Sequence, residues 1–357
     1  MSRDNQVDRL RHQIDEGDKT ILDLLNKRGE LAISIGNLKK GSGMAPYAPA
    51  READLLNRLR AMNKGPFPDK ALVAVYREIM SACLALQKPL RVAYLGPEGT
   101  FTHQASLSRF GSSAQYIPQA TIGQVFAEVE KGGCDLGVAP VENSTEGSVT
   151  DTLDLLIETP LTVCGEIFKE VSLDLLSKGG RLKEIKKIYS HPQALAQCRR
   201  WLEANLPDIP AVKVESTALA ARAARRDGRV AAIASEYAGS IYGLKVVKRS
   251  IQDSANNMTR FLVIGKEMPG RTGYDKTSLL FSVRHEPGAL VRALRPFARR
   301  RLNLSKIESR PLKGKTWEYL FFLDLEGHIS DRKVGKALEE LKGLCLYMKV
   351  LGSYPRA

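Results

Sequence analysis

The sequence predicts three domains in order: an all-α N-terminal domain, a central α/β domain and a C-terminal βαββαβ domain of ferredoxin-like type. Apolar residues repeat at helical spacing up to about residue 88, and short apolar strands alternate with helices over 91–267. A strand–helix–strand–strand–helix–strand pattern then fills 276–354. At 357 residues, the chain is long enough for each domain to bury a core.

Composition is typical of a globular protein, with 43% hydrophobic and 26% charged residues. The N-terminus is polar and no apolar run approaches the roughly 20 residues of a membrane helix, so we expect neither a signal peptide nor a membrane partner. The five cysteines are scattered without CxxC spacing, which argues against disulfides and zinc and favours a reducing cytoplasm. Five isolated histidines form no metal constellation, so we expect no cofactor.

The net charge is +14, from 54 Lys and Arg against 40 Asp and Glu. Two interpretations follow: nucleic-acid binding, which needs basic residues clustered on one face, or a general field that attracts small anionic substrates. The basic clusters Lys186–Lys187 and Arg299–Arg301 contain no interleaved aromatic residues. We therefore favour small anions and expect no nucleic-acid partner.

The N-terminal domain is expected to contain three helices. Heptad-spaced apolar residues from Val7 to Leu38 predict one long helix that Gly41–Gly43 breaks. A second helix is predicted from about Ala50 to Asn63, and a third runs to Gln87 from Asp69, a candidate N-cap.

Three cations, Arg11, Arg28 and Lys39, occupy the apolar seam of the long helix. A cation in such a seam is costly unless an anion meets it, although long side chains can also extend to water. Arg28 and Lys39 are eleven residues apart, which is about 20° around a helix. Their charged groups can therefore converge on one small anion.

The segment resembles the all-helical chorismate mutase family at Leu10–Asp15, Arg28–Ala32, Lys39, Arg51–Glu52 and Ser81–Gln87. The resemblance implies an intertwined dimer with two shared active sites, in which Arg11 reaches across to the partner's site.

By the same resemblance, Arg28, Lys39 and Arg51 hold the carboxylates and ether oxygen of chorismate, Glu52 binds the ring hydroxyl, and Gln87 donates to the ether oxygen. The implied reaction is the pericyclic rearrangement of chorismate to prephenate. It needs no acid, base or nucleophile, so an enzyme helps by holding the reactive conformer and stabilising charge on the breaking C–O bond.

Two positions of this segment depart from some members of the family. Ala48 stands where some have a carboxylate, and Cys83, a candidate substrate-binding position, stands where some have serine. Either change weakens contacts to the substrate, while the basic set is intact.

In the central domain, apolar segments that predict strands are 91–95, 136–141, 161–164, 187–189, 212–214, 230–234 and 260–264. Their alternation with helices predicts an α/β architecture with mostly parallel sheets. Five of these strands run into hydroxyl, amide or glycine residues, at 96–102, 142–148, 190–193, 215–217 and 235. Ser and Thr are also ordinary N-caps, but five such loops favour a ligand site outside the carboxyl ends of the strands.

These loops resemble prephenate dehydratase in GPEGTFTHQA (96–105), PVENSTEGSV (140–149), SHPQALAQC (190–198) and NNMTRFLVIG (256–265). The resemblance implies two α/β lobes like those of a periplasmic binding protein, with prephenate bound between them. Thr259 corresponds to the essential threonine of the TRF motif, and Asn143, Ser190 and Gln197 correspond to other residues of the cleft.

The implied dehydration removes the ring hydroxyl and ring carboxylate of prephenate together and yields phenylpyruvate. The leaving hydroxyl needs a hydrogen-bond donor or proton source, and the carboxylates need neutral donors. A threonine hydroxyl is too weak an acid to ionise, so we assign Thr259 hydrogen bonding or proton relay. Glu142 is either the proton source or a structural carboxylate, and His191, in a Ser-His-Pro turn, is interpreted as structural.

The C-terminal domain contains no catalytic cluster. Strands are predicted at 277–283, 304–308, 319–325 and 346–351, and helices at 288–301 and 331–344. It resembles the ACT amino-acid-sensing domain, with the GAL motif at Gly288, Ala289 and Leu290 and the ESRP motif at Glu308, Ser309, Arg310 and Pro311. The resemblance implies feedback inhibition by L-phenylalanine bound between paired ACT domains; a dimerisation module alone is the alternative.

The order of the three segments favours a bifunctional enzyme of L-phenylalanine biosynthesis, assembled as a homodimer or homotetramer. Two other classes are considered: a ligand-sensing transcription regulator with a helical DNA-binding domain, and a binding protein that has lost catalysis. A helix-turn-helix needs short helices, whereas the first helix here is long. The presence of Arg28, Lys39 and Thr259 argues against the second class.

Overall fold

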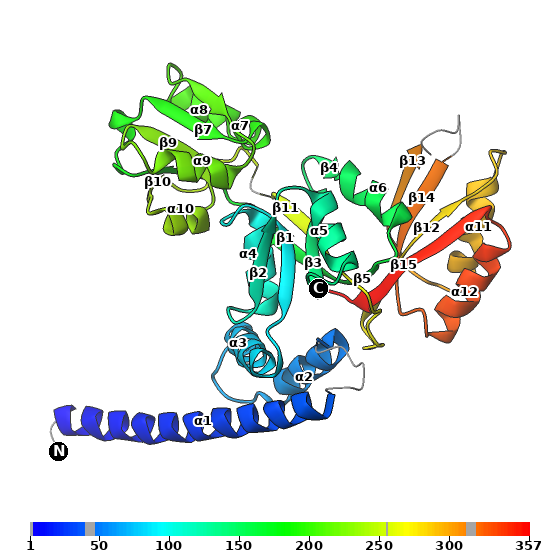
Figure 1. Cartoon of the computed structure of the whole chain (residues 1–357), viewed down its shortest axis with the longest axis horizontal. Coiled ribbons are helices and arrows are strands. Elements are labelled where there is room, and N and C mark those ends of the chain that lie inside the picture. The colour runs from blue at the N-terminus through cyan, green and yellow to red at the C-terminus, as the bar shows by residue number, and fades with distance from the viewer. Residues whose placement is uncertain (1–2, 40–46, 255, 312–318) are drawn as a thin grey trace. The chain divides into compact units, whose positions relative to one another are not determined.

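The computed structural model describes residues 3–39, 47–254, 256–311 and 319–357 (Figure 1). The chain forms two compact units. The first contains Met1–Ala48, Leu56–Leu90 and Phe110–Gln115, and the second contains Pro49–Leu55, Arg91–Arg109 and Tyr116–Ala357. The predicted central and C-terminal domains therefore share one unit.

The three predicted N-terminal helices are present. They are α1 (Arg3–Lys39), α2 (Pro49–Met62) and α3 (Asp69–Gln87). The predicted break at Gly41–Gly43 lies outside the described residues. Asp69 is not the N-cap of α3, because the backbone is still extended at Pro68 (ψ 137°) and becomes helical at Asp69. Its carboxylate instead accepts a hydrogen bond from Asn63 Nδ2 at 2.8 Å.

In the first unit, α1 and α3 approach closely at two glycines of α1. A Cβ atom on Gly36 would lie 2.9 Å from side-chain atoms of Gln87, and one on Gly29 would lie 3.3 Å from Leu86. Residues seven apart share one helix face, so both contacts lie on one face of α1. They bring the end of α3 against the stretch of α1 between Arg28 and Lys39.

The apolar seam of α1 is exposed in the single chain. Its exposed members include Val7, Leu10, Ile14, Ile21, Leu24, Leu31, Ile35 and Leu38. A stripe of this length is unusual on a monomer surface and is typical of a protein-protein contact.

The central part of the chain forms two sheets. The first has the order β2-β1-β3-β11-β5, with β4 paired to β3, and the second has the order β10-β6-β9-β7-β8. The strands are β1 Arg91–Leu95, β2 Gln115–Gln119, β3 Leu136–Asn143, β4 Gly147–Ser148, β5 Thr162–Glu170, β6 Asp174–Ser177, β7 Lys187–Ser190, β8 Ala211–Lys213, β9 Val230–Ala234, β10 Lys245–Lys248 and β11 Met258–Gly265. The helices are α4 Phe101–Phe110, α5 Ile122–Glu130, α6 Thr150–Glu158, α7 Pro192–Gln197, α8 Arg199–Asn205, α9 Thr217–Ala224 and α10 Glu236–Tyr242, and a 3₁₀ turn covers Leu182–Glu184.

The prediction of mostly parallel sheets is wrong, because both sheets are mixed. β1 is parallel to β3, and β7 is parallel to β8 and β9, whereas β11 is antiparallel to β3 and β5, and β6 is antiparallel to β9. The reason is the path between the sheets. The chain leaves the first sheet after Glu170 and returns at Met258, which pairs with Glu170, so β11 must run back along β5.

The C-terminal part has the predicted βαββαβ order, with sheet order β13-β14-β12-β15. The elements are β12 Asp275–Ser282, α11 Ala289–Arg299, β13 Leu304–Pro311, β14 Tyr319–Glu326, α12 Arg332–Lys342 and β15 Tyr347–Pro355. One hydrophobic core runs from the first central sheet into this one, since Leu156 and Val163 cluster with Phe322 and Leu351. The described part of the chain includes no helix long and apolar enough to span a membrane.

Candidate active sites

The loops that follow the strands of the two central sheets line a cavity of about 550 Å³. The lining includes Gly96–Pro97 after β1, Asn143 at the end of β3, His191 after β7, Glu215–Thr217 after β8, and Thr259 in β11. The predicted convergence of these loops is therefore present for four of the five loops. Ser235, after β9, instead caps α10 by accepting a hydrogen bond from Ala238 N–H.

A closed network of hydrogen bonds surrounds Thr259 in this cavity. Asn143 Nδ2 donates to Thr259 Oγ1 at 2.8 Å and to Asn257 Oδ1 at 2.9 Å. Asn257 Nδ2 donates to Gln197 Oε1 at 2.9 Å, and Gln197 Nε2 donates to Thr145 Oγ1 at 3.0 Å. The Thr145 hydroxyl donates back to Asn143 Oδ1 at 2.6 Å and closes the ring. Three separate segments of the chain thus fix these side chains.

The direction of the bond between Asn143 and Thr259 matters for chemistry. An amide N–H₂ group can only donate, so Thr259 Oγ1 is the acceptor. Its own hydrogen is then free to point to a group in the cavity. Thr259 pairs directly with Asn143 across β3 and β11, and both side chains are 8% exposed. The hydroxyl is therefore held as a donor on the wall of the cavity.

Two residues expected in the cleft lie elsewhere. Ser190 is fully buried, and its hydroxyl donates to the carbonyl oxygen of Ile233 at 2.6 Å, because β7 pairs with β9 at this point. Glu142 precedes Asn143 in β3, and successive side chains of a strand point to opposite faces. Its carboxylate accepts from Lys306 Nζ at 2.9 Å instead of lining the cavity.

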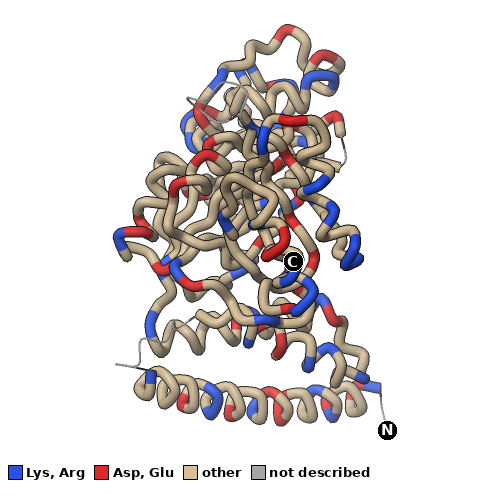
Figure 2. The backbone as a smooth tube through the Cα atoms, turned by 90° about the vertical axis from the view of Figure 1, so that its right-hand side faces the viewer, with Lys and Arg blue, Asp and Glu red and all other residues tan. Residues whose placement is uncertain are grey.

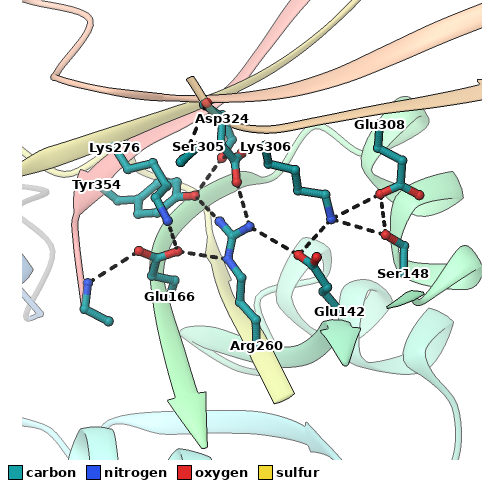
Figure 3. A network of polar contacts seen from close by, with 12 residues as sticks. Glu142, Ser148, Glu166, Arg260, Lys276, Ser305, Lys306, Glu308, Asp324 and Tyr354 are labelled. Atoms are coloured by element: carbon teal, nitrogen blue, oxygen red, sulfur yellow. Dashed lines mark hydrogen bonds and ion pairs between the residues drawn. The ribbon is translucent and has the colours of Figure 1, made fainter. Parts of the chain in front are cut away.

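Glu142, whose side chain is 39% exposed, lies at the edge of a polar network on the far side of β3 and β11 (Figure 3). At its centre, Arg260 donates to Glu166 at 2.9 Å, to Asp324 at 2.6 Å and to the Tyr354 hydroxyl at 3.1 Å. The side chains of Arg260, Glu166 and Asp324 are 8%, 1% and 9% exposed. Burial raises the pKa of Tyr354 well above its ordinary value, so this hydroxyl is neutral.

The network joins the ESRP motif to the central domain. Glu308 pairs with Lys306 at 3.1 Å and accepts from the Ser148 hydroxyl, as Figure 3 shows. Arg310 pairs with Asp154 of α6 at 3.0 Å. Ser309 and Pro311 alternate with these residues along β13 and are exposed. The four motif residues are thus divided between two faces of one strand.

The C-terminal end of α6 is also held by the C-terminal domain. Lys349 Nζ donates to the carbonyl oxygens of Leu156, Ile157 and Thr159, at 3.0, 3.1 and 2.6 Å. Such carbonyls at a helix end lack partners within the helix. Burial lowers the pKa of Lys349, although its amino group remains a donor to these carbonyls.

The GAL motif begins α11. Gly288 is the N-cap with φ of 74°, a left-handed conformation that favours glycine. Ala289 is buried, while Leu290 packs beside the core of the C-terminal sheet.

The candidate mutase residues lie as follows. Arg28 and Lys39 are half-buried on α1, and Gln87 contacts this helix at Gly36. Arg11 is exposed and pairs with Asp8 at 3.3 Å, and Cys83 is buried. In the second unit, Arg51 is exposed, and Glu52 pairs with Arg109 at 2.6 Å. In the first unit, Gln87 therefore contacts the stretch of α1 that lies between Arg28 and Lys39.

Sequence reasoning missed two members of the Thr259 network, Thr145 and Asn257. Both lie inside the motifs that carried the resemblance, and both are polar residues beside a strand end. It also missed Lys306, whose partner Glu142 lies 164 residues away. In the described part of the chain, Lys and Arg are interspersed with Asp and Glu, as Figure 2 shows for α1. No described group of three or more His, Cys, Asp and Glu is arranged for a metal ion.

Three family models match consecutive segments of the chain: chorismate mutase type II over residues 10–88, prephenate dehydratase over 92–269 and ACT domain over 277–343. A bifunctional chorismate mutase/prephenate dehydratase of Aquifex aeolicus is 51% identical over 356 residues, which cover 99% of this chain and 98% of the relative. A protein of the same description from Neisseria gonorrhoeae is 48% identical over 350 residues, with 97% and 96% covered.

Solved structures match the central and C-terminal parts. The prephenate dehydratase of Arthrobacter aurescens, in complex with L-Phe, has a TM-score of 0.69 at 36% identity and covers 75% of this chain and 90% of its own. GqqA, described as a quorum quenching acylase, has a TM-score of 0.69 at 31% identity, with 75% and 98% covered. Two descriptions share this fold, so activity must be judged from the site and from relatives that match the full length.

Proposed function

This chain belongs to the family of bifunctional chorismate mutases/prephenate dehydratases, and from that premise we propose which of its residues carry and regulate the two reactions. The mutase rearranges chorismate to prephenate, and the dehydratase converts prephenate to phenylpyruvate. The transcription-regulator alternative is set aside, because relatives that match the full length are enzymes.

For the mutase, we propose that Arg28, Lys39 and Gln87 stabilise charge on the breaking C–O bond. The support is their grouping in the first unit, where Gln87 lies against α1 between the two cations. A fixed set of donors acts on developing charge without reorganising at the moment of reaction. Arg11, Arg51, Glu52 and Cys83 remain candidates for binding the substrate.

For the dehydratase, we propose that Thr259 donates its hydroxyl hydrogen to the leaving hydroxyl of prephenate. The main support is one hydrogen bond: Asn143 Nδ2 donates to Thr259 Oγ1, so the hydroxyl hydrogen of Thr259 points away from Asn143 and toward the cavity. The reaction consumes one proton and releases water and CO₂, and the electrons of the broken carboxylate bond complete the aromatic ring. Thr259 passes on a proton, since a threonine hydroxyl does not ionise.

The reciprocal test is a pair of single variants assayed with chorismate and with prephenate by ultraviolet absorbance. Thr259→Ala is expected to abolish formation of phenylpyruvate from prephenate while chorismate is consumed at the wild-type rate. Arg28→Ala is expected to do the reverse. If one variant lost both activities while remaining folded, the assignment of separate sites would be wrong.

We also propose that L-phenylalanine binds the C-terminal domain and inhibits the dehydratase. Two observations support a route between them. Arg310 holds the middle of α6 at Asp154, and Lys349 holds its C-terminal end. Glu308 accepts from Ser148 of β4, which pairs with Glu142 and Asn143. A ligand that favours one arrangement of these contacts over another changes the dehydratase, as allostery requires.

A dimeric or tetrameric assembly is proposed from the exposed apolar stripe of α1, which a second copy of the helix would cover. We propose a cytoplasmic location because all five cysteines are free thiols, four of them buried.

A further inference from the structure

The cavity around Thr259 offers few charged groups to an anionic substrate. Among the described residues that line it, His191 and Glu215 are the ones with titratable side chains, and neither Lys nor Arg is present. Prephenate carries two carboxylates. If the cavity is the dehydratase site, as proposed above, these carboxylates must be met mainly by neutral donors, and His191 is the one lining side chain that can also become a cation.

The ring of His191 is held in one tautomer. His191 is the N-cap of α7, and its Nδ1 accepts the backbone N–H of Gln193 at 3.3 Å. A neutral imidazole carries one proton, so the proton must lie on Nε2 when Nδ1 accepts. Within the described chain, the structure records no protein partner for Nε2. The ring therefore presents a free N–H donor while its other nitrogen supports the helix.

The charge state of His191 allows its ring to donate a hydrogen bond but not to act as an acid. Burial lowers the pKa of His191 below its ordinary value, and the charge of Glu146 offsets part of this effect. The imidazole is therefore neutral near pH 7. A neutral imidazole donates a hydrogen bond from Nε2 but does not release that proton, so the leaving hydroxyl takes its proton from elsewhere.

The helix that carries His191 is also tied to the Thr259 network. Gln197, at the end of α7, donates to Thr145 and accepts from Asn257. Both of these residues are hydrogen-bonded to Asn143, which donates to Thr259. The start of α7 and the catalytic hydroxyl thus line the same cavity and are held by one chain of bonds.

We propose that His191 is a substrate-binding residue of the dehydratase, whose Nε2–H donates to a carboxylate of prephenate. This assignment replaces the structural interpretation of the Ser-His-Pro turn with a double role: Nδ1 caps α7 and Nε2 binds the substrate.

Two variants separate these roles because each retains one of them. In His191→Asn, the short amide oxygen can take the place of Nδ1 as an N-cap, but no donor reaches the position of Nε2. In His191→Gln, the longer amide can supply a donor near Nε2 but is a poor cap. A hydrogen bond to a charged group is worth a factor of about 10 to 100 in binding. We therefore expect His191→Asn to raise KM for prephenate at least tenfold with a smaller change in kcat.

His191→Gln is expected to keep KM within a factor of about three of the wild type and to unfold at a lower denaturant concentration, since the cap is lost. Mutase turnover of chorismate by the same full-length proteins is the control that the effect is confined to the dehydratase. A wild-type KM in His191→Asn, with or without a defect in His191→Gln, would overturn the proposal.

A pH series provides the second readout. Below the pKa of His191, an imidazolium would attract the dianion, so KM of the wild type should fall as pH is lowered from 7.5 to 5.5, with the enzyme-free rate subtracted. Glu146, whose charge acts on this ring, and Glu215, which lines the same cavity, are retained in every variant. The fall should be absent from both variants, and its persistence in His191→Asn would contradict the proposal. Failure of the wild type to form phenylpyruvate would instead refute the function proposed for the cavity.

Discussion

Replacing Arg260 with methionine tests whether the buried network holds the dehydratase domain and the ACT domain together. Methionine keeps most of the length of the side chain but removes the guanidinium. Glu166 keeps Lys276 at 2.7 Å, and Asp324 keeps the Ser278 hydroxyl at 2.5 Å, but neither retains its arginine. Removing one partner of a buried pair costs about 3–5 kcal/mol, because the remaining charge is left uncompensated.

The measurement is guanidinium-induced unfolding, followed by far-ultraviolet circular dichroism and by loss of dehydratase activity. We expect the free energy of unfolding of the second unit to fall by about 3–5 kcal/mol. The matched control is Arg249→Met, which breaks a pair with Glu236 whose side chains are 63% and 53% exposed. An exposed pair contributes about 1 kcal/mol or less. Equal losses in the two variants, or a loss below about 1 kcal/mol for Arg260→Met, would refute the reasoning from burial.

Two further predictions concern regulation and pH. Asp154→Asn should weaken inhibition by L-phenylalanine severalfold without changing the uninhibited dehydratase rate, because it breaks the pair with Arg310. The control is Asp151→Asn, at an exposed position of the same helix. Equal inhibition curves for the two variants would contradict the route through α6. Burial lowers the pKa of His103, which stacks on Tyr94 at 4.8 Å, while Glu98 opposes the shift. At a pH between the usual histidine pKa near 6.5 and the lower pKa of His103 in the folded chain, the unfolded chain binds more protons than the folded one. The free energy of unfolding should therefore fall on acidification from pH 7.5 to 5.5. His103→Phe should show a shallower slope, and an unchanged slope would show that His103 is not responsible.

Helices and central strands of this chain could be predicted because their apolar spacing is regular. The third helix has the predicted bounds, and β1 and β9 match to the residue. The strands that were missed, β2, β4, β6 and β10, have two to five residues. Length is not the reason, because β7 and β8, of four and three residues, were predicted. β2 contains a proline, β4 is Gly147–Ser148, and β6 and β10 each have two apolar residues between polar ones.

Strand direction could not be predicted, because it depends on where the chain re-enters a sheet. The return of β11 beside β5 is a property of the path between two sheets, and residues 171–257 intervene. The expectation for Ser190 failed for a related reason: whether a hydroxyl after a strand faces a cleft or a neighbouring strand depends on which strand lies beside it. β9 lies beside β7, and Ile233 takes the hydrogen bond.

The face of the sheet on which Glu142 lies, in contrast, could have been predicted from the alternation of side chains along a strand. Thr259 and Phe261 of β11, and Asn257 just before this strand, line the cavity at every second position. Arg260 must therefore face the other side, and Glu142 must do so if Asn143 faces Thr259. What the sequence could not supply is the identity of the groups on that far side, because Lys306 and Asp324 come from another sheet.

The same alternation supplies a route for the proposed effect of the C-terminal domain on the dehydratase site. β3 and β11 carry Asn143 and Thr259 on one face and Glu142 and Arg260 on the other, one residue apart in each strand. The far face contacts Lys306 of β13, and β13 also carries Glu308 and Arg310. Because a strand is stiff across adjacent residues, a change in the β13 contacts that shifts Glu142 or Arg260 also shifts Asn143 or Thr259. A displacement of a few tenths of an ångström is enough to weaken a 2.8 Å bond that orients a hydroxyl.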